Sequence, residues 1–299
     1  MFGLFNRKKE KKGFNITSRY GNFIQKENET VLEGALRQNI LLPHNCRVGT
    51  CRRCEVFING STVLACQFSS DSDITLEYNK QWHKANIDNI TQLGNDIIKV
   101  GLFAPSIEFD EEQEGQYIDL TFDKQKSSQR KYSIVNINEK HLILHVKKHP
   151  RGEVSNLLAD SRHGQEIFIS QPQGEFRLPN FNTTPSTGLA IATGSGMGVA
   201  LTLLDKLCSK YLINPTIIST SRKKSLGKYH DLLISDFKKK HPITKDYCMN
   251  IDEVNNYLKS SQESNATYIV CGTPELNQLF FDNRVLIEKS RSSIVQESF

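Results

Sequence analysis

The sequence lacks any long apolar run. Apolar residues make up 37 % of the 299, and no stretch approaches the roughly 18–20 consecutive apolar residues of a membrane span. That fraction lies above the range of disordered chains, and the length allows two or three domains with real cores. The opening residues, MFGLFNRKKEKK, carry their charges after a short apolar patch, the reverse of a secretory signal. We therefore expect a cytoplasmic protein, in which thiols stay reduced.

The body of the chain lacks an excess of basic charge. The formal net charge is +5, of which residues 1–12 contribute +4, so about +1 remains for the rest by subtraction. A nucleic-acid-binding protein would carry a basic patch within its folded domain, so we expect no nucleic-acid partner. Residues 1–13 are predicted to be a basic disordered tail. Contact of residues 1–12 with a membrane surface is the less favoured alternative.

Four of the seven cysteines are closely spaced, with gaps of four, two and eleven residues between Cys46, Cys51, Cys54 and Cys66. Four thiolates are enough to saturate the coordination of an iron–sulfur cluster. A structural zinc site also uses four cysteines, but usually as two C-x-x-C pairs, and the second pair is lacking here. Disulfides are disfavoured by the expected compartment. The spacing therefore favours a cluster over zinc.

Regular structure is predicted on both sides of these cysteines. Two short β-prone runs flank the Gly21-Asn22 turn, and Thr30-Val-Leu-Glu33 is a capping box that starts a helix. After Cys54, Asn59-Gly60 separates EVFI from STVLAC, a strong hairpin signal. That hairpin returns Cys66 to the loop carrying the other three cysteines. We predict a compact domain over residues 14–80.

Residues 81–182 contain short apolar or alternating runs, among them GQYIDLTF, KYSIVN, HLILHVKK and QEIFIS. Polar and turn-type residues separate the runs at roughly regular intervals, which is the pattern of a small antiparallel barrel.

Residues 183–299 predict a nucleotide-binding α/β unit. A short apolar strand, GLAIAT, runs into Gly194-Ser-Gly196-Met-Gly198, and the helix VALTLLDKLCSKYL is expected to follow. A strand, a glycine turn and a helix together place pyrophosphate on a helix N-terminus. The spacing is G-x-G-x-G, so the Rossmann fingerprint G-x-G-x-x-G is not met.

The next strand, PTIISTS, ends in Ser221-Arg222-Lys223-Lys224. An acid at this place would bind the ribose 2′-hydroxyl of NAD, whereas a basic residue such as Arg222 suits a 2′-phosphate. The lack of an acid leans toward NADPH, but a solvated basic loop explains the pattern equally well. The choice between NADH and NADPH stays open.

The motif NCRVGTCRRC…VLACQ resembles the [2Fe–2S] ferredoxins, which implies a β-grasp-like domain whose four cysteines bind the cluster. The four-two spacing is that of plant-type ferredoxins. The eleven-residue gap instead resembles the iron–sulfur subunit of succinate dehydrogenases and the cluster domains of molybdenum hydroxylases. Arg47, Arg52 and Arg53 place three cations beside an anionic cluster. They favour its reduced state or form a docking face for an acidic partner.

Arg130-Lys-Tyr132-Ser133 resembles the R-x-Y-S/T signature of the ferredoxin–NAD(P)+ reductase superfamily, which implies FAD binding. Arg130 would neutralise the pyrophosphate, Tyr132 would lie flat on the isoalloxazine ring, and Ser133 would bond near N5. Simple barrel packing is the alternative role for Tyr132. The later stretch VKKHPRGEVSNLL resembles the turn whose amides meet the FAD phosphates; its residues here are Gly152, Val154 and Ser155.

Two further elements are similar to those of the same superfamily. Thr193 and the glycines 194, 196 and 198 match its G-G/S-x-G-I/M motif, and ATYIVCGTPELN matches its C-G-x-P element. The resemblance places Cys271, Gly272 and Pro274 beside the nicotinamide, and lets the terminal Phe299 cover the flavin. As alternatives, Cys271 is a buried strand residue and Phe299 a frayed end.

The domain order is similar to that of the reductase components of phenol hydroxylase, methane monooxygenase and benzoate dioxygenase systems. We therefore predict an α+β and α/β multidomain oxidoreductase with a [2Fe–2S] domain (14–80), an antiparallel β-barrel FAD domain (81–182) and a Rossmann-like parallel NAD(P) domain (183–299). It would pass electrons from NADH or NADPH through FAD and the cluster to a partner protein, expected to be an oxygenase. The predicted catalytic residues are Ser133, Cys271 and Phe299. Alternatives are another acceptor, such as a sugar deoxygenation enzyme or a membrane redox complex, and a non-enzymatic cluster sensor.

Overall fold

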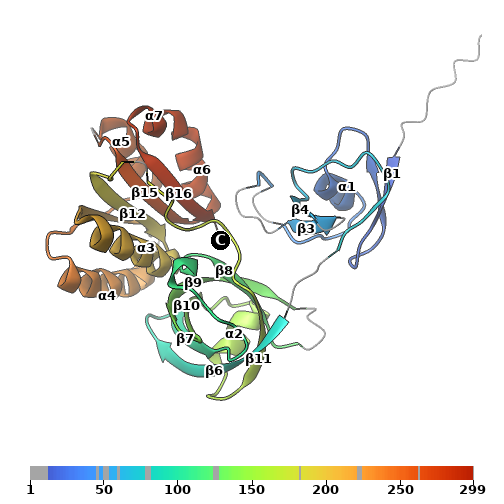
Figure 1. The fold of residues 1–299 in the computed structure, drawn as a ribbon, viewed down its shortest axis with the longest axis horizontal. Coiled ribbons are helices and arrows are strands. Elements are labelled where there is room, and N and C mark those ends of the chain that lie inside the picture. The colour runs from blue at the N-terminus through green and yellow to red at the C-terminus, as the bar shows by residue number, and fades with distance from the viewer. Residues whose placement is uncertain are drawn as a thin grey trace, which may run out of the picture. The chain divides into compact units, whose positions relative to one another are not determined.

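The computed structural model describes residues 13–44, 47–49, 54–58, 61–77, 82–123, 128–181, 183–220, 224–261 and 263–298. The chain divides into two compact units, Met1–Asn79 and Lys80–Phe299. Figure 1 labels their elements.

The first unit is a small mixed sheet with one helix and one hairpin. β1 (Gly13–Thr17) pairs antiparallel with β2 (Phe23–Lys26) and parallel with β5 (Ile74–Thr75). β3 (Glu55–Ile58) and β4 (Ser61–Leu64) form the predicted hairpin, although its Asn59-Gly60 turn lies outside the described residues. The strand β1 includes Gly13, which the sequence had suggested belongs to the tail.

The helix α1 (Val31–Arg37) begins at the predicted capping box, where the Thr30 hydroxyl accepts from the Glu33 amide. Its first two amides donate outside the helix, to the carbonyl oxygens of Phe68 and Ala65 at 2.9 and 2.8 Å. The helix thereby holds the segment around Cys66 in place.

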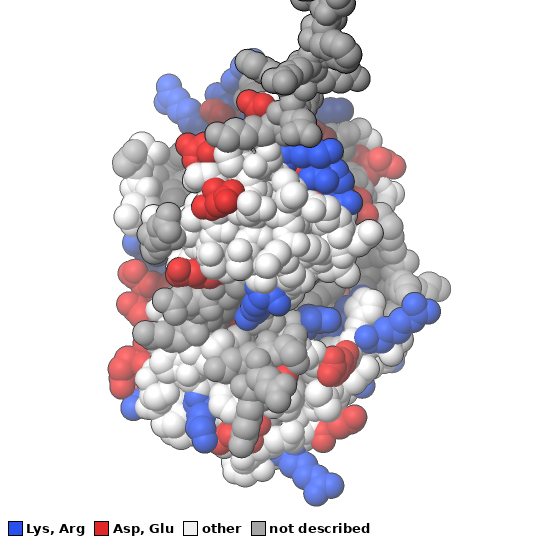
Figure 2. All heavy atoms as spheres, turned by 90° about the vertical axis from the view of Figure 1, so that its right-hand side faces the viewer, with Lys and Arg blue, Asp and Glu red and all other residues white. Residues whose placement is uncertain are grey.

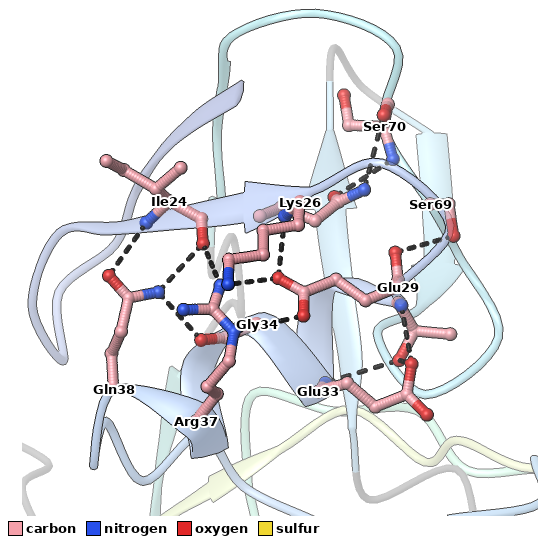
Figure 3. A network of polar contacts seen from close by, with 11 residues as sticks. Ile24, Lys26, Glu29, Glu33, Gly34, Arg37, Gln38, Ser69 and Ser70 are labelled. Carbon is pink, nitrogen blue, oxygen red and sulfur yellow. Dashed lines mark hydrogen bonds and ion pairs between the residues drawn. The ribbon is translucent and has the colours of Figure 1, made fainter. Parts of the chain in front are cut away.

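Figure 3 shows a second restraint on this helix, in which Arg37 reaches back to Glu29 with Nη2 2.6 Å from Oε1. The hydrogen bond from Arg37 is the main reason that the pKa of Glu29 lies below its usual value. The same guanidinium donates to the Ile24 carbonyl oxygen at 2.7 Å, which joins the helix to β2.

The second unit begins with a closed antiparallel barrel of six strands, in the spatial order β10-β7-β6-β11-β8-β9. Its core is a cluster of alternate, inward-facing Ile, Leu, Val and Ala side chains. The strands, with the 3-10 helix η1 (Glu111–Gln113) and the helix α2 (Glu153–Ala159), are β6 (Trp82–Gln92), β7 (Ile97–Phe103), β8 (Tyr117–Thr121), β9 (Arg130–Asn138), β10 (His141–Lys147) and β11 (Glu166–Ser170).

A five-stranded parallel sheet follows, in the order β14-β13-β12-β15-β16. The buried strands are rich in β-branched residues and alanine, as expected of a sheet covered on both faces. The elements are β12 (Thr187–Thr193), α3 (Gly196–Tyr211), β13 (Asn214–Thr220), α4 (Lys224–Lys240), β14 (Lys245–Cys248), α5 (Ile251–Ser260), β15 (Ala266–Gly272), α6 (Pro274–Asp282), α7 (Arg284–Lys289) and β16 (Ser293–Ser298).

The helices cover the sheet from both sides, as the red and orange ribbons of Figure 1 show. Residues of α3 and α4 share one core with Ala190, Ile217 and Cys271 of the strands. Residues of α5, α6 and α7 share the other core with neighbouring strand residues such as Ile191 and Val270. This arrangement is the predicted Rossmann-like fold, and the barrel and mixed sheet confirm the rest of the predicted fold class.

Charged side chains of both signs are interspersed on the face drawn in Figure 2. None of the described helices has both the length and the apolar character required to cross a membrane.

Candidate functional site

The predicted cluster ligands fall around the β3–β4 hairpin. Cys54 stands just before β3 and Cys66 just after β4, and both side chains are buried, at 3 % and 9 % exposure. The Ala65 amide donates to the Cys54 carbonyl oxygen at 2.9 Å, so the two cysteines lie at the same end of the hairpin. Cys46 and Cys51 lie outside the described residues, as do Arg52 and Arg53.

The loop before the hairpin is held against this end. Gln67 donates from Nε2 to the Val48 carbonyl oxygen at 3.1 Å. Arg47 and Gly49 have positive φ values of 60° and 85°, so the backbone turns tightly here. A side chain at Gly49 would collide with Gln67, since a Cβ atom there would lie 2.3 Å from Nε2.

The predicted flavin motif lies at the start of β9. Arg130 is exposed and donates from Nη1 to the Gln129 carbonyl oxygen at 2.7 Å. Tyr132 is half-buried against the barrel core, and burial raises the pKa of its phenol well above the usual range. Because side chains alternate along a strand, Ser133 takes the opposite side from Tyr132, next to Tyr117 of β8. Barrel packing thus accounts for the Tyr132 ring, and its flavin contact stays a prediction.

The second predicted flavin element is the turn that leads into α2. The Gly152 amide donates to the His149 carbonyl oxygen at 2.8 Å, and the Ser155 hydroxyl accepts from the His149 amide at 3.2 Å. The same hydroxyl donates to the Gly152 carbonyl oxygen at 3.1 Å. The Gly152 amide is therefore committed to the turn. The amides of Val154 and Ser155 stand in the first helical turn, which lacks carbonyl partners within the helix.

The glycine turn of the parallel sheet connects β12 to α3. The helix begins at Gly196, not at Val199 as the sequence suggested, so Gly196 and Gly198 lie in its first turn. Gly194 has φ +54°, and no described atom lies within 4 Å of the position that its Cβ atom would take. The first turn of this 16-residue helix carries neither an acidic residue nor a side-chain cap. Such an uncapped N-terminus suits an anion.

The predicted C-G-x-P element lies at the end of β15, the neighbour of β12. The Thr273 amide donates to Oγ1 of Thr193 at 3.1 Å, which joins the ends of these strands. Cys271 is fully buried, and burial, followed by the charge of Glu297, raises the pKa of its thiol. Its side chain belongs to the core on the α3 side. Pro274 starts α6.

A residue of α6 that the motifs did not indicate contacts the end of β16. Asn277 of α6 donates from Nδ2 to the Glu297 carbonyl oxygen at 3.0 Å and to that of Thr273 at 3.1 Å. Ser298, which follows Glu297 in β16, pairs with Gly272 of β15. Phe299 lies outside the described residues, so its predicted role as a flavin cover stays a prediction, as does that of Arg222.

The residues present fit the predicted cofactors. Three buried polar atoms have no hydrogen-bond partner in the part of the chain that the structure describes: Gln129 Oε1, Asn277 Oδ1 and Ser298 Oγ. Gln129 precedes Arg130, and the other two adjoin the ends of β15 and β16. Buried polar groups of native proteins are normally bonded, so atoms left unbonded here are consistent with bound groups. The uncapped α3 and the two buried cysteines fit a dinucleotide and a metal cluster, respectively.

Sequence reasoning missed the residues that support the glycine turn from α4 and the barrel: Tyr229, His230 and His145. No local motif marks them, because 31 residues or more separate them from Gly198 in the chain. The signal that remained was the presence of two adjacent ring residues, Tyr and His, in the first half of an amphipathic helix.

Comparison with known families identifies two parts of the chain. Residues 18–80 match the 2Fe-2S iron-sulfur cluster binding domain, and residues 86–178 match the oxidoreductase FAD-binding domain.

Curated relatives align with 60 % of the chain. The chain is 28 % identical over 211 residues to the CDP-6-deoxy-L-threo-D-glycero-4-hexulose-3-dehydrase reductase of Yersinia pestis. It is 27 % identical over 213 residues to the reductase component of propane 2-monooxygenase of Rhodococcus jostii. Each alignment covers 60 % of this chain, and 62 % and 57 % of the respective relatives, so less than two thirds of either relative is matched.

Solved structures share the fold over nearly the whole chain. The Amycolatopsis cytochrome P450 reductase GcoB superposes with a TM-score of 0.61 at 18 % identity, covering 96 % of this chain and 98 % of that one. The ferredoxin reductase in carbazole 1,9a-dioxygenase gives 0.62 at 16 % identity, covering 97 % and 99 %. The chain therefore joins a 2Fe-2S iron-sulfur cluster binding domain to an oxidoreductase FAD-binding domain, and it shares the fold of these solved reductases.

Proposed function

We propose that this protein oxidises NADH or NADPH and delivers the electrons singly to a partner protein, an oxygenase or hydroxylase, in the cytoplasm. The observation that carries the proposal is the presence in one chain of a cluster domain, a flavin barrel and an uncapped glycine turn. When bound, FAD accepts a hydride and releases single electrons, which the [2Fe–2S] cluster carries onward.

The protein's own residues bind and orient these groups. The first turn of α3 offers its positive end to the dinucleotide pyrophosphate. Arg130 offers a guanidinium to the FAD pyrophosphate. At the end of β15, Cys271 stays a neutral thiol, because burial raises its pKa, and it packs beside the site without adding a charge.

Cys54 and Cys66 supply two of the four proposed cluster ligands, together with Cys46 and Cys51. Their burial excludes water from two of the sulfur atoms, and α1 fixes the segment around Cys66 through its first amides. Arg47, which is exposed beside this loop, supports a docking face that favours an acidic partner.

Two acceptors with different requirements test the proposal. The wild-type protein is expected to reduce both ferricyanide and cytochrome c with NADH or NADPH, and comparing the two nucleotides settles the preference. The Cys66→Ser variant should lose the cluster absorption and most cytochrome c reduction while keeping ferricyanide reduction, because flavin suffices for ferricyanide. Cys248→Ser, which removes an exposed thiol on β14, is the matched control and should match wild type.

If Cys66→Ser keeps both ferricyanide and cytochrome c reduction, Cys66 is not a cluster ligand. A wild-type protein that binds its cofactors and oxidises neither nucleotide would instead favour a cluster sensor.

A second acceptor class is favoured by one observation, the similarity to the Yersinia pestis dehydrase reductase. In that case the partner would be a sugar dehydrase. The reduced protein should then transfer electrons to that purified dehydrase faster than to the hydroxylase component of an oxygenase such as propane 2-monooxygenase. The opposite order of rates would exclude the dehydrase.

A further inference from the structure

Two adjacent residues of α4 reach the glycine turn that precedes α3. Tyr229 and His230 are 0 % and 1 % exposed, although the helix that carries them is otherwise rich in charge. The two helices cover the same side of the parallel sheet (Figure 1). Neither residue belongs to a motif that the proposed function uses.

His230 links the glycine turn to the end of β13. Its Nε2 lies 2.9 Å from the carbonyl oxygen of Gly194, and its Nδ1 is hydrogen-bonded to the hydroxyl of Ser219. The carbonyl oxygen only accepts, so Nε2 carries a proton and donates. In the neutral ring Nδ1 then accepts from Ser219. One side chain thus joins the two strand ends that, in a dinucleotide fold, face the pyrophosphate and the adenine ribose.

Tyr229 links the same turn to the barrel. Its hydroxyl donates to the Ser195 carbonyl oxygen at 3.3 Å and lies 2.7 Å from Nδ1 of His145 on β10. The Gly198 amide donates to the same Ser195 carbonyl oxygen at 3.2 Å. A hydroxyl that donates to Ser195 can accept from Nδ1 of His145, so the two bonds of Tyr229 are compatible.

The packing around Gly198 shows how closely these groups are fitted. A Cβ atom on Gly198 would lie 2.2 Å from Nδ1 of His145 and 3.0 Å from the Tyr229 hydroxyl. Gly198 is therefore required by the residues behind the turn. Gly194 differs, since no described atom lies within 4 Å of the position of its Cβ atom and its φ is positive. Among the described residues the turn is thus crowded at Gly198 and uncrowded at Gly194.

We infer that Tyr229 and His230 are positioning residues for the dinucleotide site, which hold the Gly194–Gly198 turn in its binding conformation from behind. His230 sets the turn relative to the end of β13, and Tyr229 sets it relative to the flavin barrel through His145. The inference rests on the proposed function, because it takes NADH or NADPH as the ligand of the turn. It assigns the two residues no contact with that ligand.

Nucleotide affinity distinguishes this role from ordinary core packing. The FAD-loaded, full-length protein is titrated calorimetrically with NADP+ and with NAD+. Tyr229→Phe removes only the hydroxyl, and His230→Leu removes both the Nε2 donor and the Nδ1 acceptor. His230→Gln retains an amide donor near the position of Nε2. Tyr268→Phe is the matched control, since it removes another buried, hydrogen-bonded hydroxyl from the same domain, on β15.

Tyr229→Phe and His230→Leu are expected to weaken binding of the preferred nucleotide about threefold to tenfold, the usual effect of losing a neutral hydrogen bond. The KM for NADH or NADPH should rise by the same factor while kcat changes less than about twofold. His230→Gln should recover most of the affinity. Tyr268→Phe should lower the melting temperature without changing the affinity.

Unchanged affinity in both Tyr229→Phe and His230→Leu would overturn the inference, as would an equal loss of affinity in Tyr268→Phe. If His230→Leu does not fold, Tyr229→Phe and His230→Gln still decide the question. These results leave the proposed function standing whenever wild type oxidises NADH or NADPH. A wild-type protein that neither binds nor oxidises either nucleotide contradicts both.

Discussion

The turns before α2 and α3 look alike in the sequence, and they are supported in different ways. Both place a glycine before a helix, and both are predicted to meet phosphates. The α2 turn is closed by its own neighbours, because Ser155 and His149 bond to each other and to Gly152 within seven residues. The α3 turn is supported by side chains from α4 and from the barrel, which are distant in the chain.

This difference separates local from long-range determination of a binding site. The α2 turn depends on hydrogen bonds that its own sequence supplies, so changes elsewhere should leave it intact. The α3 turn depends on how α4 and β10 pack, and its geometry is therefore tied to the orientation of the nucleotide-binding sheet relative to the flavin barrel. Such a fixed orientation suits a site in which the nicotinamide nucleotide must contact the flavin.

The largest effect is expected from a methyl group on the first turn of α3. Gly198→Ala places Cβ against His145 and Tyr229, and overpacking of this kind costs about 1–3 kcal/mol. The free energy of unfolding in urea should fall by that amount, and nucleotide affinity should fall with it.

Gly152→Ala is the counterpart on the α2 turn. Its Cβ would lie 2.4 Å from Oγ of Ser155 and 2.9 Å from Cβ of His149. The Ser155 side chain can rotate away at the loss of about 1 kcal/mol of hydrogen bonding, and His149 must shift slightly. FAD retention should fall, with nucleotide affinity unchanged. A larger loss of nucleotide affinity in Gly152→Ala than in Gly198→Ala would contradict the assignment of nucleotide binding to the α3 turn.

Acid should destabilise the α3 turn more than the α2 turn. Burial, followed by the charge of Lys99, lowers the pKa of His145 to about 4, and burial lowers that of His230. In the unfolded chain both titrate near 6.5. The contribution of His145 to stability is therefore complete above pH 6.5 and is lost as the pH falls from 6.5 toward 4, and that of His230 also falls below pH 6.5.

For His145 alone this loss amounts to about 1 kcal/mol at pH 5.5. Urea denaturation between pH 8 and pH 5 measures the loss. In His145→Gln the free energy of unfolding should depend less steeply on pH. A dependence as steep as that of wild type would show that His145 does not cause the loss.

The smallest effect is expected from a single hydroxyl of the α2 turn. Ser155→Ala leaves the His149 amide without its partner, at a cost of about 1 kcal/mol, and should release FAD more readily on gel filtration. Ser161→Ala is the control, because its hydroxyl bonds to the Leu157 carbonyl oxygen at the far end of α2. Equal FAD release from both variants would show that the turn has no special part in retention.

The elements could be predicted from sequence where the signal is local. The capping box at Thr30, the hairpin between β3 and β4 and the alternating barrel strands depend on neighbouring residues, and the structure confirms them. The sequence predicts the start of α3 three residues late, because glycines favour loops although their amides can open a helix. Tyr229, His230 and His145 were missed because only tertiary packing brings them to the glycine turn.

The central claim is that one chain carries electrons from a nicotinamide nucleotide through flavin to a cluster, and an anaerobic absorption titration tests it most directly. The oxidised holoprotein should show flavin bands overlaid on the broad [2Fe–2S] absorption. Stepwise addition of NADH or NADPH should bleach both, and Cys66→Ser should show only the flavin change. Bleaching of the flavin while the cluster absorption of wild type stays oxidised would contradict the proposed path.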